Sequence, residues 1–176
     1  MSQVFNYKFI ASTDVSMIQG KLPGVKDDWD EFKWRQKRFE VHKKTKTIPL
    51  IFDKDFRGNN PTYHLHYAFF QKDLHELWKL YTTHFKKGFI IRALLVMLPA
   101  KSKIPIHIDR GTSLDLCRRT HIPIVTHEDV IFEIDGEKKH LKEGEIWEIN
   151  NTNKRHSVIN GSEKDRIHLI LDWMVK

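Results

Sequence analysis

Residues 130–149, VIFEIDGEKKHLKEGEIWEI, contain three predicted β-strands in quick succession. Asp135-Gly136 lies between the first two runs, and this dipeptide is a strong signal for a two-residue hairpin turn. Gly144 separates the second run from the third. Because the runs are short and are joined by tight turns, the segment predicts antiparallel strands rather than helix.

The chain on both sides of this segment continues the pattern. Eight runs of strand length follow one another up to residue 174: 89–98, 104–108, 119–126, 130–134, 137–141, 146–149, 156–160 and 166–174. Short strands with frequent turns favour a β-sandwich or barrel, of which the jelly roll is one solution. The sequence therefore predicts a mainly β fold with supporting helices.

The first 88 residues mix short strands, loops and one predicted helix. Apolar side chains recur with helical spacing after Asp73, at Leu74, Leu77, Trp78, Tyr81 and Phe85. Asp73 with Glu76 forms a candidate N-terminal capping pair, and Gly88 is a candidate helix end. We interpret the stripe as a surface that faces the core rather than as a binding site.

Length and composition fit one globular domain. The chain has 176 residues, of which 40% are hydrophobic and 30% charged. We expect a single domain over 1–176, with a mixed N-terminal part at 1–88 and a jelly-roll core at 89–176. The single cysteine, Cys117, excludes an internal disulfide and suits a reducing compartment. Without a secretory signal pattern or an apolar run of membrane-spanning length, we expect a cytoplasmic protein with no membrane partner.

The net charge of +7 favours anionic partners in general. The basic residues do not gather into one dense stretch, and no nucleic-acid-binding motif is present. We therefore interpret the surplus as a solvated surface, with a nucleic-acid-binding module as the alternative.

His107-Ile-Asp109 lies at a predicted strand, where side chains two residues apart point to one face. An imidazole and a carboxylate so placed provide two ligands of a two-histidine, one-carboxylate triad, which leaves open positions on Fe(II). His-x-Asp is a weak motif, and His127-Glu-Asp129 repeats it at a predicted turn, where a solvated role is the better interpretation. The alternative for Asp109 is that it caps the turn at Arg110-Gly111.

Residues farther along the chain complete a candidate site. His156 opens a predicted strand, and Arg166 lies on the next one. An enzyme that chelates 2-oxoglutarate must also hold the distal carboxylate of this dicarboxylate, which suits the guanidinium of Arg166. Arg119 and His121 face one side of another strand and offer a second cationic contact. The alternatives are surface arginines and hydrogen-bonded core histidines.

The stretch from Ile104 to Trp173 resembles the aspartyl/asparaginyl β-hydroxylase family. The matching text is IPIHID at 104–109, RTHIPI at 119–124, GEIWEIN at 144–150, HSVIN at 156–160 and RIHLILDW at 166–173. Residues 89–98, with Arg92, are similar to the family's preceding strand. The resemblance covers about half of the chain strongly and the first half loosely.

The resemblance implies a double-stranded β-helix, the cupin-like jelly roll, and a dioxygenase that uses Fe(II), 2-oxoglutarate and O2. It implies iron held by His107 and His156, and 2-oxoglutarate held by Arg166, with Arg119 and His121 near its metal-side carboxylate. The best-known animal members have glycine in place of Asp109, whereas this chain keeps the full triad, as do the similar free-proline hydroxylases.

Three readings of function follow. The first is hydroxylation of a C–H bond in an amino-acid residue, with peptidyl Asp or Asn as the substrate. The second is hydroxylation of a free amino acid of the proline type by the same mechanism. The third is a non-catalytic or differently metallated cupin-like protein, for which His64-Leu-His66 is the only motif.

Overall fold

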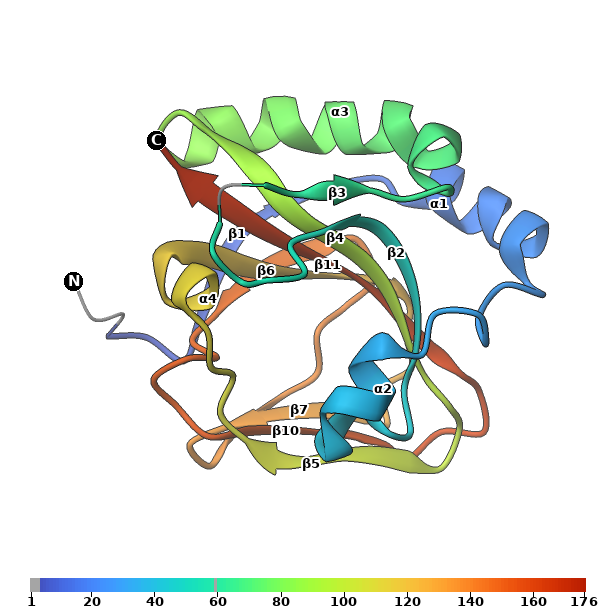
Figure 1. The fold of residues 1–176 in the computed structure, drawn as a ribbon. Helices are drawn as coiled ribbons and strands as arrows, with labels where there is room; N and C mark the ends of the chain where they lie inside the picture. The colour runs from blue at the N-terminus through green and yellow to red at the C-terminus, as the bar shows by residue number, and fades with distance from the viewer. Residues whose placement is uncertain (1–3, 59) are drawn as a thin grey trace.

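The computed structural model describes residues 4–58 and 60–176, and within them eleven strands form two antiparallel sheets. The larger sheet contains, in spatial order, β1 (Tyr7–Ser12), β9 (Glu145–Ile149), β6 (Cys117–Val125), β11 (Arg166–Val175), β4 (Gly88–Leu98), β2 (Lys46–Phe52) and β3 (Thr62–Tyr63). The smaller sheet contains β5 (Ser102–His107), β10 (His156–Asn160), β7 (Val130–Ile134) and β8 (Glu137–Lys139). Figure 1 shows the two sheets stacked above one another.

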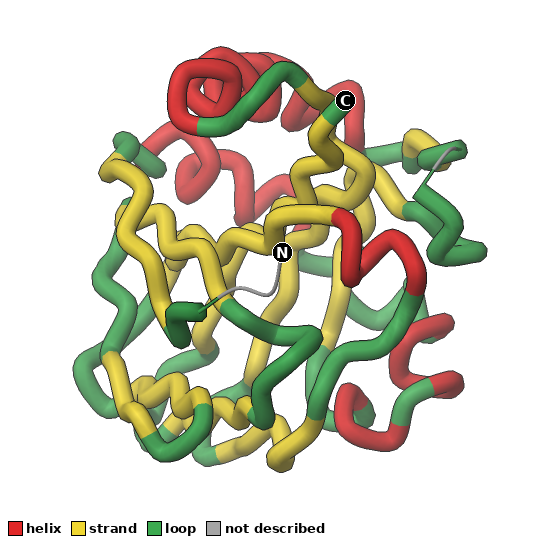
Figure 2. The backbone as a smooth tube through the Cα atoms, turned by 90° about the vertical axis from the view of Figure 1, so that its left-hand side faces the viewer, coloured by secondary structure: helices red, strands yellow, loops and turns green. Residues whose placement is uncertain are grey.

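Helices cover one side of this sandwich and close one end of it. They are α1 (Ser16–Lys21), α2 (Trp34–Arg38), α3 (Tyr67–His84) and α4 (Thr112–Leu116), with 3-10 turns η1 (Leu22–Val25) and η2 (Glu40–His42). The long helix α3 lies across the outer face of the larger sheet, as both views show (Figures 1 and 2). The turn η2 contacts β5 of the smaller sheet. No helix in the described ranges is long and apolar enough to cross a membrane.

Two apolar layers hold these parts together. One lies between the larger sheet and the helices α1 and α3, where Phe70, Leu74 and Tyr81 are buried against the sheet. The other lies between the sheets and contains Leu98 of β4 and Phe132 of β7. The helix-backed sandwich confirms the predicted mainly β, jelly-roll fold.

The predicted hairpin is present between β7 and β8. Asp135 and Gly136 both have positive φ, of 48° and 83°, as the two-residue turn requires. The predicted bounds of the strand that contains His107 are wrong by one or two residues. The prediction is 104–108, whereas β5 begins at Ser102 and ends at His107. Asp109 therefore follows the strand, and its position comes from other contacts.

The predicted start and end of the long helix are wrong. The helix begins at Tyr67, one turn and a half before Asp73, because the buried stripe extends back to Phe70. Asp73 forms an ion pair with Lys21 instead of a cap. Gly88 opens β4, where a Cβ would lie 2.1 Å from the Met174 carbonyl oxygen, so close strand pairing is what requires glycine.

The aromatic stripe is only partly a core surface. Leu74, Leu77, Tyr81 and Phe85 are buried as predicted. Trp78 is the exception, because it lies at the edge of the buried face. It is 39% exposed and stacks on His75.

Candidate active site

The smaller sheet places two histidines side by side. β5 pairs with β10 so that His107 lies directly opposite His156, and both side chains leave the same face of the sheet. Their ring centroids are 4.1 Å apart. The strand register therefore brings the two predicted ligands together from distant parts of the sequence.

Backbone carbonyls orient both imidazoles. The Nδ1 of His107 lies 2.8 Å from the Pro105 carbonyl oxygen, and the Nδ1 of His156 lies 3.4 Å from that of Lys154. A carbonyl oxygen only accepts hydrogen bonds, so each Nδ1 carries the proton and each Nε2 keeps a free lone pair. This tautomer is the one that a metal ion bound at Nε2 requires.

Asp109 turns its carboxylate toward both histidines. Its Oδ1 lies 3.6 Å from the Nε2 of His107, and its Oδ2 lies 4.0 Å from the Nε2 of His156. Arg119 and Asn151 donate hydrogen bonds to Oδ2, the latter over 2.8 Å. Burial alone would raise the pKa of Asp109, but Arg119 and the nearby imidazoles hold it well below its usual range.

The distances among these three side chains can be compared with those that a divalent metal ion requires. Adjacent ligands with bonds of about 2.1 Å stand roughly 3 Å apart. The separations of 3.6 and 4.0 Å are longer and run to different oxygens of Asp109, so the side chains must move closer together to hold one ion. Burial lowers the pKa of His156 to about 4, so its imidazole is neutral near pH 7 and free to act as a ligand.

A third histidine, His42 of η2, lies at the same place and was not predicted. Ligand atoms of His42, His107 and Asp109 lie within 4.8 Å of one another. However, Nη2 of Arg35 lies 3.1 Å from Nε2 of His42. A guanidinium only donates, so the lone pair of this nitrogen is already engaged. His156 is therefore better prepared than His42 to bind an ion.

A buried ion-pair network supports Asp109 from behind. Asp172 on β11 lies opposite Arg92 on β4 and Arg119 on β6 in the strand register. It accepts hydrogen bonds from Nε of Arg92 at 2.7 Å, and from Nε and Nη2 of Arg119 at 2.8 Å each. The same Arg119 reaches Asp109 through Nη1. Asp172 thus fixes the guanidinium that positions the candidate ligand.

Arg166 is a buried cation without an anion. It is 1% exposed, its Nη2 donates to Nδ1 of His168 at 2.6 Å, and its Nε has no partner among the described residues. No ion pair joins it to a carboxylate in the described part of the chain, and burial lowers its pKa to about 9. A guanidinium in this state is prepared for a carboxylate supplied by a ligand.

One small cavity brings all the predicted site residues together. His107, Asp109, His156, Arg119, His121 and Arg166 all line it. Its volume is about 30 Å³, which holds one or two water molecules. A dicarboxylate therefore requires side chains to move apart. The six residues predicted from the sequence do meet at one place.

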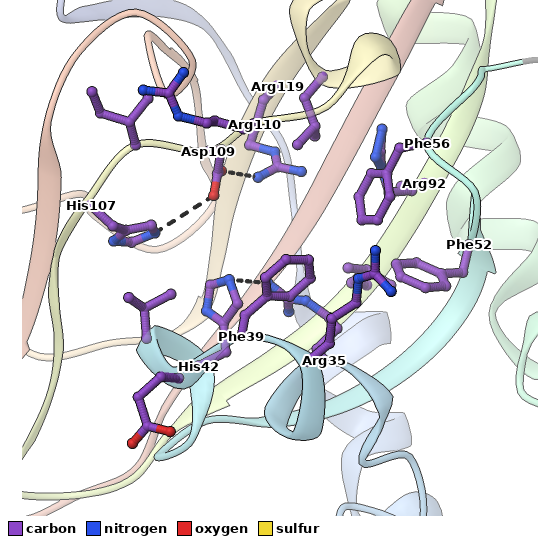
Figure 3. A pocket seen from close by; sticks show the side chains of 16 residues that line it. Arg35, Phe39, His42, Phe52, Phe56, Arg92, His107, Asp109, Arg110 and Arg119 are labelled. Carbon is purple, nitrogen blue, oxygen red and sulfur yellow. Dashed lines mark hydrogen bonds and ion pairs between the residues drawn. The ribbon is translucent and has the colours of Figure 1, made fainter.

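A larger cavity of about 410 Å³ opens beside the small one. The two share five lining residues: Arg35, His42, His107, Asp109 and Arg119. Phe39, Phe52 and Phe56 form aromatic walls of the larger cavity. Figure 3 shows Asp109 and Arg119 above, His42 and Arg35 below, and the phenylalanines between and beside them.

The other histidine motifs lie elsewhere. His66 pairs with Asp28 at 2.8 Å, and His64 packs against the rings of Phe32 and Phe52. His64 and His66 therefore do not form the pair of metal ligands that the cupin-like motif would require. His127 is an exposed turn residue that accepts the backbone N–H of Asp129, as expected.

The groups that orient the ligands were not identified from the sequence. Among the polar residues at the end of β9, Glu148 pairs with Arg118 and Asn150 donates to the Phe5 carbonyl. Backbone carbonyls and Asn151 take this role instead. A backbone carbonyl has no sequence signal, and Asn151 could be found only from the fold.

A jelly roll with two histidines, a carboxylate and an unneutralised guanidinium in one cavity is the arrangement of a non-haem iron oxygenase. The family model for aspartyl/asparaginyl beta-hydroxylase matches residues 6–175. This chain belongs to the aspartyl/asparaginyl β-hydroxylase family. It is thus a 2-oxoglutarate-dependent hydroxylase whose cofactor is Fe(II) and whose co-substrates are 2-oxoglutarate and O2.

Solved structures of similar fold include other oxygenases. A 2OG-Fe(II) oxygenase family oxidoreductase from Burkholderia pseudomallei is 14% identical, with a TM-score of 0.61 over 93% of this chain and 91% of that one. A prolyl-4-hydroxylase from Pseudomonas putida is 9% identical, with a TM-score of 0.56 over 98% and 94%. A collagen prolyl hydroxylase from Paramecium bursaria Chlorella virus-1 is 10% identical, with a TM-score of 0.57 over 98% of each chain. The search of curated protein sequences found no significant match.

Proposed function

We propose that the hydroxylase binds Fe(II) through His107, Asp109 and His156. The observation that carries this assignment is the register of β5 and β10, which sets the two imidazoles opposite one another beside an anionic carboxylate. Arg119 and Asn151 hold one oxygen of Asp109 and leave the other facing His107. The negative charge of Asp109 adds to the affinity for a divalent cation in a partly buried site.

We also propose that Arg166 binds the distal carboxylate of 2-oxoglutarate, with Arg119 and His121 near the metal-side carboxylate. This accounts for a buried guanidinium without a carboxylate partner among the described residues. Bound Fe(II) with its co-substrate supplies the oxidation of an unactivated C–H bond. The chain's own residues orient the ligands, neutralise the dicarboxylate and, through the phenylalanines of the larger cavity, exclude water.

For the substrate we propose a peptidyl Asp or Asn residue, in keeping with the name of the family. A free amino acid of the proline type is the second candidate. One observation favours it: a cavity of about 410 Å³ has the size of a small-molecule site. In both cases the substrate occupies the larger cavity beside the metal ligands.

We further propose that the chain acts as one oxygenase domain in the cytoplasm. Strands β1 and β2 from the first 88 residues belong to the same sheet as β4, β6, β9 and β11. The lone cysteine, Cys117, is buried and unpaired, which suits a reducing compartment.

The test is mass spectrometry with Fe(II), 2-oxoglutarate and O2. Peptides with a central Asp or Asn, and free amino acids including proline, are each incubated with the enzyme. The proposal predicts a gain of one oxygen atom on a peptide and one succinate for each hydroxylation. Oxygen gain on free proline alone would select the second candidate. Succinate formation that does not depend on Fe(II) would contradict both.

A further inference from the structure

A second buried arginine lacks a carboxylate partner. Arg35 of α2 is 8% exposed. Its hydrogen bonds go to neutral groups: Nη2 to Nε2 of His42 at 3.1 Å, and Nη1 to the Thr47 hydroxyl at 3.4 Å. Within residues 4–58 and 60–176, no Asp or Glu lies within ion-pair distance of it. Burial, followed by the nearby charge of Arg119, lowers its pKa to about 10 despite the opposing charges of Asp109 and Asp172, so the group remains charged at neutral pH.

Arg35 differs in this respect from the other arginines of the larger cavity's inner wall. Arg92 and Arg119 share the carboxylate of Asp172, and Arg92 lies 3.7 Å from Asp53 as well. Burying a guanidinium without a counter-charge costs stability, and such a group is retained where a ligand supplies the charge. The lack of a carboxylate partner for Arg35 therefore points to an anionic ligand.

The position of Arg35 shows which ligand it meets. Arg35 lines both cavities together with His107 and Asp109, whereas Arg166 lines only the small one. Nη1 of Arg92, which is 1% exposed, has no hydrogen-bond partner and belongs to the wall of the larger cavity too. In Figure 3 the Arg35–His42 pair lies across the cavity from Asp109. Arg35 is thus exposed to the larger cavity, where we propose that the substrate binds.

The balance of charge leaves room for one more anion. Fe(II) and dianionic 2-oxoglutarate cancel one another when both are bound. Among the charges that are not exposed to solvent, the guanidinium groups are Arg35, Arg92, Arg119 and Arg166, whereas the carboxylates are Asp53, Asp109 and Asp172. Arg38, Arg110 and Glu40 of the larger cavity are exposed and screened by water. One positive charge remains, and Arg35 is the guanidinium left without a partner.

We infer that Arg35 binds a carboxylate on the substrate and thereby selects acidic substrates over amide or uncharged ones. The inference rests on the proposed function and narrows its substrate class. The Asp side chain carries such a carboxylate, whereas the isosteric Asn side chain does not. A fork of N–H donors to a carboxylate is the strongest hydrogen-bonding arrangement available here.

The test measures binding rather than turnover. Protein loaded with Mn(II) and 2-oxoglutarate, without O2, is titrated calorimetrically with N-acetyl-aspartate N-methylamide and with its asparagine counterpart. We expect the aspartate probe to bind wild type at least about tenfold more tightly, as one charge-assisted hydrogen bond gives. In Arg35→Gln this preference falls to near one. Lys37→Gln removes a charge from the exposed side of the same helix and keeps the preference.

If Arg35→Gln does not fold, Arg35→Lys replaces it in the test. Lysine keeps the positive charge but lacks the fork of N–H donors, so the preference for the aspartate probe should fall severalfold. Mn(II) affinity, measured for each variant, shows that the metal site is intact. Equal or undetectable binding of the two probes to wild type, or an unchanged preference in a folded Arg35 variant, would overturn the inference. If wild type forms no succinate but prefers the aspartate probe, and Arg35→Gln loses this preference, the proposed function is refuted and the inference about Arg35 stands.

Discussion

Asp172→Asn removes the central charge of the network behind Asp109. Asp172 is fully buried and accepts three hydrogen bonds, from Arg92 and Arg119. Asparagine has the same shape, but it presents an NH2 group to donors and leaves two guanidinium groups without their shared anion. Breaking a buried pair in this way costs about 3–5 kcal/mol. Because Asp53 and Asp109 remain near these cations, we expect the lower end, about 3 kcal/mol.

Urea denaturation of the metal-free protein measures this change, and thermal unfolding gives an independent value. For a chain of this length, about 3 kcal/mol corresponds to a fall in Tm of roughly 6–12 °C. Asp129→Asn, at an exposed turn, is the matched control and should lie within about 0.5 kcal/mol of wild type. An Asp172→Asn protein as stable as the control would refute the idea that this carboxylate holds the two arginines in place.

Two further predictions concern co-substrate and pH. Arg166→Ala should raise the 2-oxoglutarate concentration required for half-maximal succinate formation at least tenfold. Tm should change little, because the packing lost with the side chain is offset by removal of a buried charge that has no partner. Unchanged 2-oxoglutarate affinity, measured by titration, would argue against the assignment. Burial lowers the pKa of His156 to about 4, and it also depresses those of His42, His121 and His168. The unfolded chain binds protons at these sites near pH 6.5, so stability is full above that pH and falls as pH drops toward 4. The loss at pH 5.5 should be about 1.4 kcal/mol for His156 alone, and the other three histidines should change stability in the same direction. Urea midpoints that agree at pH 7.5 and 5.5 would contradict this.

Local pattern was sufficient for the strands of the jelly roll. Apolar runs with turn residues between them specify short antiparallel strands, and Asp135-Gly136 fixes its hairpin through backbone conformation alone. The start of α3 was missed because Phe70, which continues the buried stripe, stands in a run of aromatic residues that carries no clear period.

Part of the candidate site was also predictable. The motif around His107 and the order of His156 and Arg166 along the chain identified residues that do line one cavity. Arg35 and His42 were not identified, because they come from a short helical segment without a motif and reach the site only through the contact of η2 with β5. The partners of Arg119 depend on register across three strands, which no local pattern specifies.

Titration of the protein with Fe(II) in the absence of O2 tests the central claim most directly. Wild type should bind one ion, and His107→Ala and His156→Ala should abolish binding. Asp109→Ala should weaken it partially, since two imidazoles remain. His42→Ala should leave the affinity unchanged, because the Nε2 of His42 already accepts a hydrogen bond from Arg35. Loss of binding in His42→Ala with full affinity in His156→Ala would contradict the account and assign the ion to His42, His107 and Asp109.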